Sequence, residues 1–246
     1  MATIDLNLDA GESTAALTDG CEEDLYRLVS SVNIACGGHT GDQESMTKAV
    51  ELAKKYNLRI GAHPSFPDRE NFGRVAMKMS HEDLVKSLVG QIRSLRNICA
   101  LHKVSVMHIK PHGALYNLAA RERVLAGAVI EAAQEFHERV TMIGLAGSPF
   151  LKWCQASRFR ALAEGFPDRR YEANGSLRGR EHDDAIISDP AECARQAVRL
   201  VQEGKVQTLC VHSDTPNALA VASAVRIALE NAGISIGLAA RGENEY

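Results

Sequence analysis

The chain has 246 residues, of which 45% are hydrophobic, and its net charge is −3. This near-neutral balance gives no reason to expect a nucleic-acid or acidic-membrane ligand, and no apolar run has the length of a membrane span or the form of a signal peptide. The six cysteines include no Cys-x-x-Cys pair, so we expect no zinc finger or disulfide framework, but a cytoplasmic protein with one domain over residues 1–246.

Seven short runs of β-type composition follow one another, and helical patterns separate most of them. They cover residues 3–9, 31–37, 58–64, 105–113, 140–147, 159–166 and 208–214. Capping residues mark the helix starts: Asp42, Ser80 and Asp189 each precede an apolar stripe, and Thr215 with Pro216 is expected to open the last helix. This order of strands and helices predicts a parallel sheet with right-handed crossovers.

Polar residues recur where a sheet buried on both faces would be apolar. Asp5, Asn7 and Asp9 alternate with aliphatic residues in the first run, and His63 and His212 lie near the ends of later runs. A doubly wound sheet would carry near-continuous hydrophobic strands instead. We therefore predict an α/β fold, an incomplete seven-stranded β/α barrel whose site is formed by the carboxyl ends of the strands.

The stretch HIKPHGALYN is the most specific polar motif. On a strand, His108, Lys110 and His112 share one face, where burial is costly unless they bind something or each other. We predict that His108 lies deeper, hydrogen-bonded to Asp5 or Asn7, while Lys110 and His112 reach a ligand. The change Lys110→Met is accordingly expected to abolish activity and to leave the fold intact.

Two further stretches allow more than one interpretation. In NIACGGHTGD the glycines permit close backbone approach, and the helix that Asp42 caps could receive an anion, unless His39 merely sits on a glycine-rich turn. In AEGFPDRRY, Glu164, Asp168 and Arg169 are as easily ordinary loop charges as site residues. No phosphate-loop, dinucleotide-binding, nucleophile-elbow or zinc-protease signature occurs.

Six motifs in order carry a resemblance to a known family. They are NLDAGES, SVNIACGGHTGD, IGAHPSFPDRENFGRVAM, HIKPHGALYN, DRRYEANGSLRGR and CVHSDTPNA. Through them the chain closely resembles the LamB/YcsF family over essentially its whole length. The resemblance implies a barrel of the glycoside hydrolase/deacetylase type. It also implies ATP-dependent opening of 5-oxo-L-proline (pyroglutamate) to L-glutamate, with ATP as the co-substrate, accompanied by Mg²⁺. The resemblance further implies that two partner subunits take part in this 5-oxoprolinase reaction.

Residue roles follow as hypotheses from the chemistry of that reaction. Opening an unreactive lactam after phosphorylation of its carbonyl oxygen needs a base for water, a cation near that oxygen and donors for the substrate carboxylate. We assign Asp9 or His112 as the base and Lys110 as the cation. The residues expected to bind or orient the substrate are Asn7, Glu12, Asn33, His39, Asp42, His63, Tyr116, Asn117, His212 and Asp214. Because the chain lacks a nucleotide loop, we expect the ATP site to be shared with the partners.

Two alternatives stay open. In a metal-dependent N-deacetylase or amidohydrolase of the same barrel superfamily, Asp9, His63 and His112 would hold a divalent ion in a three-ligand open site. In a non-catalytic subunit, the same pocket would bind 5-oxoproline and present it to the partners. The chain also departs from the family pattern at Gly38 and Val75, which we expect to enlarge or neutralise part of the pocket.

Overall fold

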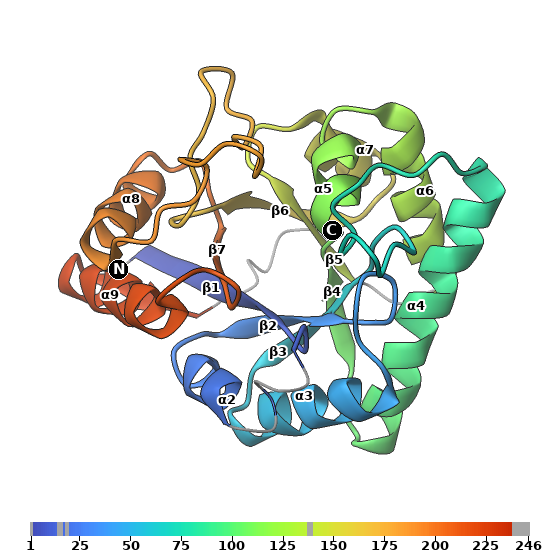
Figure 1. Ribbon diagram of the computed structural model, residues 1–246, viewed down its shortest axis with the longest axis horizontal. Helices are drawn as coiled ribbons and strands as arrows, with labels where there is room; N and C mark the ends of the chain where they lie inside the picture. Colours follow the sequence, from blue (N-terminus) through green and yellow to red (C-terminus); the bar gives the residue numbers. More distant parts are fainter. Residues whose placement is uncertain (1, 14–16, 18–19, 137–139, 238–246) are drawn as a thin grey trace.

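Seven parallel strands close into a barrel, and helices surround it (Figure 1). The computed structural model describes residues 2–13, 17, 20–136 and 140–237. Strands β1 to β7 lie in spatial order, and β1 pairs with both β2 and β7, which closes the barrel. The predicted fold, an α/β barrel of seven strands, is confirmed.

The strands are β1 Ala2–Ala10, β2 Ser31–Ala35, β3 Arg59–His63, β4 Val106–Ile109, β5 Thr141–Leu145, β6 Arg160–Gly165, β7 Thr208–His212 and β8 Ile234–Ile236. The helices are α2 Cys21–Tyr26, α3 Gln43–Lys55, α4 His81–Leu101, α5 Gly113–Ala119, α6 Arg123–Gln134, α7 Pro149–Ala156, α8 Pro190–Gln202 and α9 Ala218–Asn231. The sequence did not predict β8, which pairs with the start of β1. This strand has three residues, fewer than most strands, so the alternation of polar and apolar residues that would indicate a strand is too short to recognise.

Side-chain caps begin three of the helices as predicted. Asp42, Ser80 and Asp189 each accept a hydrogen bond from a backbone N–H in the first turn of α3, α4 and α8. The predicted start of the last helix at Thr215 is wrong. Helix α9 begins later because Asn217, with a φ of 61°, occupies the left-handed region immediately before it.

The alternation along β1 separates two environments. Its aliphatic residues join the apolar core, whereas Asp5, Asn7 and Asp9 are buried and hydrogen-bonded to other polar side chains. Asn7 donates to Glu164 at 3.0 Å and to Thr208 at 2.6 Å, which come from two other strands. Barrel interiors are usually filled by branched apolar residues, and here these hydrogen bonds offset the cost of burying polar side chains instead.

His108 lies inside this polar interior, as predicted, but with a different partner. Its ring Nε2 is 2.8 Å from Oδ1 of Asn33, and its hydrogen bond is to neither Asp5 nor Asn7. The ring also passes directly over Gly61, where a Cβ atom would overlap it. Glycine at this point of β3 therefore leaves the room that the imidazole needs.

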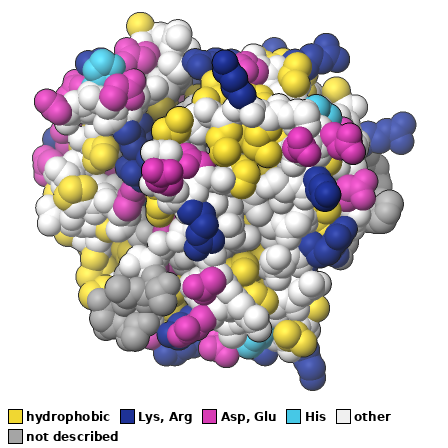
Figure 2. Space-filling view, turned by 45° about the vertical axis from the view of Figure 1, so that its right-hand side comes forward, with side chains coloured by type: hydrophobic (Ala, Val, Ile, Leu, Met, Phe, Trp, Pro, Cys, Tyr) yellow, Lys and Arg dark blue, Asp and Glu magenta, His cyan; other side chains and the backbone are white. Residues whose placement is uncertain are grey.

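The outer surface agrees with the near-neutral charge. On the face in Figure 2, acidic, basic and apolar side chains are interspersed, with no extended basic stripe of the kind that binds nucleic acid. Among the described residues, no helix combines the length and the apolar character needed to cross a bilayer.

Candidate active site

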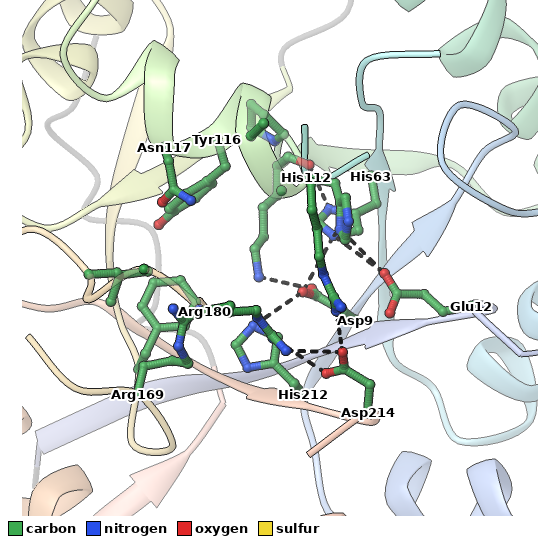
Figure 3. Close-up of a pocket in the computed structure, with 18 of the residues that line it drawn as sticks. Asp9, Glu12, His63, His112, Tyr116, Asn117, Arg169, Arg180, His212 and Asp214 are labelled. Atoms are coloured by element: carbon green, nitrogen blue, oxygen red, sulfur yellow. Dashed lines mark hydrogen bonds and ion pairs between the residues drawn. The ribbon is translucent and has the colours of Figure 1, made fainter. Parts of the chain in front are cut away.

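A pocket of about 280 Å³ opens where the barrel strands end (Figure 3). The predicted site residues that line it are Asp9, Glu12, His63, Lys110, His112, Tyr116, Asn117, His212 and Asp214. Other lining residues come from the segment after β3 and from the β6–α8 loop, residues 166–189; they include Arg74, Phe166, Arg169, Leu177, Arg180 and Glu181. The predicted position of the site at the carboxyl ends of the strands therefore agrees with the structure.

Lys110 occupies the floor of the pocket and is only 2% exposed. Its ammonium lies 2.8 Å from Oδ1 of Asp9 and 3.0 Å from Oε1 of Glu164. Burial would lower the pKa of Lys110, but Asp9 and Glu164 outweigh it and hold that pKa well above its usual value. The lysine is therefore a paired, fixed cation shared by two buried carboxylates.

Asp9 is the carboxylate on which the charged groups converge. Its Oδ1 accepts from Lys110 and, at 2.8 Å, from the amide of Asn33, whereas its Oδ2 lies 3.3 Å from Nε2 of His63 and 3.8 Å from Nε2 of His212. Burial would raise the pKa of Asp9, but a protonated His63 and the Lys110 ammonium outweigh that effect and hold the pKa well below its usual value. When His63 is neutral, the ammonium of Lys110 remains as the positive charge beside Asp9. Asp9 is consequently ionised at neutral pH.

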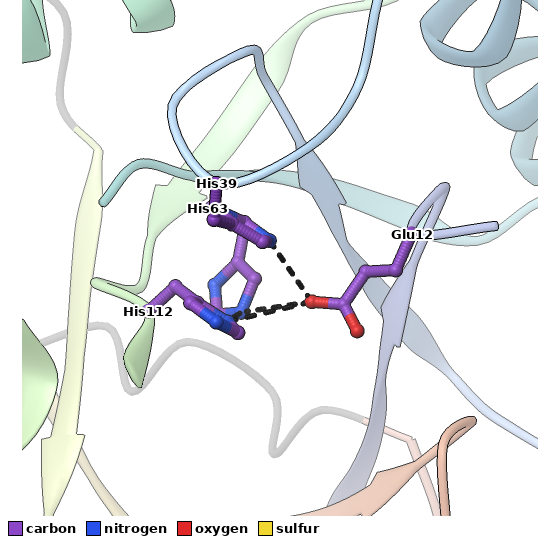
Figure 4. Close-up of side chains that lie close together, drawn as sticks. All are labelled: Glu12, His39, His63 and His112. Atoms are coloured by element: carbon purple, nitrogen blue, oxygen red, sulfur yellow. Dashed lines mark hydrogen bonds and ion pairs between the residues drawn. The ribbon is translucent and has the colours of Figure 1, made fainter. Parts of the chain in front are cut away.

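Three imidazoles gather around Glu12 on one side of the pocket (Figure 4). His39 and His112 stack in parallel with ring centroids 3.7 Å apart, and His63 packs edge-on against both. Glu12 Oε1 lies 3.0 Å from His39 Nε2 and 3.4 Å from His112 Nδ1. Burial, with a smaller contribution from Asp9, raises the pKa of Glu12 to about 7.

The hydrogen bonds on the far side of two rings assign their tautomers. Nδ1 of His63 faces the backbone carbonyl of Lys110 at 2.7 Å, and Nε2 of His112 faces that of Phe72 at 2.9 Å. A carbonyl oxygen only accepts, so both of these nitrogens carry the hydrogen. In neutral rings the other two nitrogens are then bare, and they face each other at 3.0 Å.

The third imidazole follows the same pattern. The hydroxyl of Ser65 donates to the carbonyl of Phe66 at 2.7 Å, so it accepts from Nδ1 of His39 at 3.1 Å. The remaining nitrogen of His39 is then bare and faces Glu12. Burial lowers the pKa of His39 to about 3, and burial together with the neighbouring imidazoles holds that of His112 well below its usual value. Three nitrogen lone pairs and one carboxylate oxygen thus converge on one point, an arrangement that requires a metal ion or shared protons.

His212 is held in place by a carboxylate that is not part of the pocket. Asp168 Oδ2 accepts from both the ring Nδ1 of His212 at 2.8 Å and its backbone N–H at 3.1 Å, and also from the Thr215 hydroxyl. Burial would raise the pKa of Asp168, but His212 outweighs it and lowers that pKa. The bond fixes Nδ1 as the donor and leaves Nε2 of His212 directed towards Asp9.

Four of the residues predicted to bind or orient the substrate do not line this pocket, and their contacts with a substrate stay a prediction. Asp42 is exposed and its carboxylate is used as the cap of α3. Asn7 and Asn33 are fully buried beneath Lys110 and Asp9, where they fix those two side chains through hydrogen bonds. The remaining one is His39, which lies behind His112 and contacts Glu12.

The two departures from the family pattern are also placed differently from the expectation. Gly38 packs against Gln91 and Ser65, where a Cβ would overlap both side chains, and Val75 is 51% exposed. Because these two residues do not line the pocket, they do not enlarge it or neutralise part of it.

Glu164, Asp168 and Arg169 are buried, and each either lines the pocket or bonds to a residue that does, so the interpretation as ordinary loop charges is wrong. A signal for the first was present, because Glu164 stands near the end of its strand as His63 and His212 do. Arg180 was not singled out, since nothing in its local sequence distinguishes it from the neighbouring arginines of the β6–α8 loop.

Comparisons with known proteins agree with this fold. A sequence model of the LamB/YcsF family matches residues 4–243. A relative from Chloroflexus aggregans, which is named as one of the subunits of 5-oxoprolinase, is 42% identical over 96% of this chain and 98% of its own length. The crystal structure of a lactam utilization protein from Thermus thermophilus covers 96% of this chain and 100% of its own, with 39% identity and a TM-score of 0.87. A family 4 carbohydrate esterase from Streptomyces lividans, at 10% identity, covers 97% of this chain and 93% of its own with a TM-score of 0.52, a likeness of fold alone.

Proposed function

The chain belongs to the LamB/YcsF family, and from this premise we propose that it is the barrel subunit of an ATP-dependent 5-oxoprolinase. The reaction opens the ring of 5-oxo-L-proline to give L-glutamate, and two further subunits take part. The names of the relatives support lactam chemistry. The observation that carries the proposal is the pocket itself, in which an ionised Asp9, a paired Lys110 and three histidines face one small cavity.

Asp9 is the proposed general base of this reaction. Its carboxylate is ionised, it lines the pocket, and its Oδ2 is directed towards two imidazoles. It would accept the proton of the water that attacks the activated lactam carbon. His112, the other candidate base, uses Nε2 to donate to a backbone carbonyl and directs Nδ1 towards Glu12, which favours a role in holding Glu12 or a metal ion.

Lys110, the cation assigned from the sequence, is proposed to act partly through the carboxylates with which it pairs. Its charge is already neutralised by Asp9 and Glu164, so it keeps Asp9 ionised and fixed in direction. Because its ammonium still borders the pocket, it also offers a positive charge to oxygen atoms that become negative during the reaction.

We further propose that Glu12, His39, His63 and His112 hold a divalent ion. Two ligand atoms of a tetrahedral zinc site are about 3.3 Å apart. Three of the six distances between these four atoms are 3.0 Å, 3.0 Å and 3.4 Å, the distance from His63 Nε2 to Glu12 Oε1 is 3.9 Å, and all four atoms lie within 4.8 Å of one another. Glu12 thus replaces Asp9 in the ligand set expected from the sequence, because Asp9 is engaged by Lys110. Because four protein ligands already complete a tetrahedral site, an ion held here would polarise the lactam carbonyl as a Lewis acid only if it accepted that oxygen as a further ligand.

A second cluster, formed by Asp9, Cys210 and His212, is a poorer cation site. The ammonium of Lys110 lies 3.0 Å from Sγ of Cys210 and 2.8 Å from Asp9, so a metal ion there would meet a fixed positive charge. Burial also raises the pKa of the Cys210 thiol well above its usual value, which disfavours the thiolate that a metal needs.

The proposed function is tested by measuring glutamate released from 5-oxo-L-proline. The chain alone is expected to release little or none, and the chain with its two partner subunits is expected to release glutamate only when ATP is present. In the assembled complex, Asp9→Asn should lower turnover by about 10²-fold because the base is lost. Fast release by the chain alone without ATP would overturn the proposal and favour a metal-dependent amidohydrolase.

A further inference from the structure

Arg169 is a buried cation without a carboxylate to balance it. It lines the pocket and is 5% exposed. Its Nε donates to the carbonyl of Ala185 at 3.3 Å and its Nη2 to that of Arg178 at 2.7 Å, which fixes the plane of the guanidinium. Within the described part of the chain, no Asp or Glu oxygen forms an ion pair with it. Buried charges are normally paired, because an uncompensated one is costly.

The neighbouring charges do not supply the missing partner. Asp168 gives one oxygen to His212, and Asp214 is shared by Arg74 and Arg180. Burial and, next, the positive charge of Arg180 lower the pKa of Arg169 to about 10, so it remains protonated at neutral pH. Of the three described arginines on this wall, Arg74 and Arg180 pair with Asp214, and Arg169 is the one without an ion pair.

Tyr116 presents a second unsatisfied group to the same cavity. Its side chain is 6% exposed and lines the pocket, and its hydroxyl lies beside the buried Glu164 carboxylate without a well-aligned hydrogen bond to any described residue. Burial and, next, the charge of Glu164 hold the pKa of Tyr116 well above its usual value, so the hydroxyl keeps its hydrogen. In Figure 3, Tyr116 and Arg169 lie on one side of the pocket, whereas Glu12 and His63 lie on the other. A protonated hydroxyl without a well-aligned acceptor can turn to donate its hydrogen to a ligand in the pocket.

We propose that Arg169 and Tyr116 form a carboxylate subsite, which anchors the lactam by its carboxylate. The inference rests on the proposed function and adds the orientation of the substrate. A guanidinium presents parallel donors that match a carboxylate, and Tyr116 adds another donor on the same side. The ionised Asp9 disfavours a carboxylate at its own position, so the lactam carbonyl, and not the carboxylate, faces Asp9 and Lys110.

The test compares two ligands of nearly equal size and shape, 5-oxo-L-proline and 5-oxoprolinamide, in which a neutral carboxamide replaces the carboxylate. Isothermal titration of the full chain is expected to show that the acid binds at least about tenfold more tightly than the amide. In Arg169→Gln this preference should fall to about twofold or less, while the affinity for the amide changes little. The control is Arg170→Gln, because the Arg170 guanidinium pairs with Glu192 instead of lining the pocket, and it should keep the preference.

Each other result counts against the subsite in a distinct way. Equal binding of acid and amide by the unmodified chain would overturn the subsite and leave the proposed function standing. An equal loss of both ligands in a folded Arg169→Gln protein would show a structural role only. If neither ligand binds the unmodified chain, the proposed function fails and the subsite fails with it. Thermal unfolding of the variant separates misfolding from lost recognition, and the comparison in the unmodified chain decides the matter even if the variant does not fold.

Discussion

Lys110→Met is expected to lower turnover of the assembled complex by about 10³-fold and to destabilise the fold by about 3–5 kcal/mol. The methionine preserves most of the side-chain volume but leaves Asp9 and Glu164 buried together without their shared cation. Glu164 is fully buried, so water cannot replace the lost charge. This prediction differs from the one made from the sequence, in which the fold stays intact, because it takes into account the ion pairs of Lys110 with Asp9 and Glu164.

A double variant separates the two effects. In the double variant Lys110→Met/Glu164→Gln, one of the two buried carboxylates that have lost their cation is replaced by a neutral amide. The free energy of unfolding, measured with urea, should then recover in part, whereas turnover should not recover. Lys205→Met is the control: this lysine is 75% exposed and should change stability by less than about 0.5 kcal/mol. A stability loss below about 1 kcal/mol in Lys110→Met, or activity within about tenfold of the original, would disprove the assigned role.

Loss of the proposed metal ion should have an effect of similar size. Elemental analysis of the purified chain is expected to find about one equivalent of a divalent metal, and Glu12→Gln or His39→Gln should lose most of it. Turnover of the complex should then fall by about 10²–10³-fold, because Lewis-acid assistance contributes several kcal/mol. The readout of bound metal does not depend on activity, so it tests the site even where partner subunits are absent.

The matched control for the metal site is His81→Gln. His81 is an exposed histidine that pairs with Glu131 away from the pocket, and its loss should leave the metal content unchanged. If the unmodified chain contains no stoichiometric metal and does not bind added Zn²⁺ in titration calorimetry, the four side chains share protons instead, and the metal proposal is wrong.

Local sequence signals correctly predicted which strand residues point into the barrel and which lie at the pocket. Period-two alternation in β1 placed Asp5, Asn7 and Asp9 on the inner face, and the polar residues at strand ends placed His63 and His212 at the pocket. Both signals depend only on neighbouring residues, which is why a single sequence contains them.

Partnerships across the barrel were not predictable in the same way. Lys110 and Glu164 meet only because β4 and β6 belong to one closed barrel, and the sequence around each residue does not indicate that the other is its partner. Asp42 illustrates the converse: the cap was predicted, but a carboxylate used as a cap is no longer free for a substrate. The hydrogen bonds that leave bare nitrogens facing Glu12 likewise require coordinates, because they come from distant backbone carbonyls and a serine.

The most direct measurement of the central claim is a crystal structure of this chain soaked with 5-oxo-L-proline. The account predicts the lactam in the barrel pocket, with its ring carbonyl towards Asp9 and Lys110 and its carboxylate within hydrogen-bond distance of Arg169. An unoccupied pocket under conditions where titration shows binding, or a lactam bound on another surface of the molecule, would contradict the claim that this pocket is where the ring is opened.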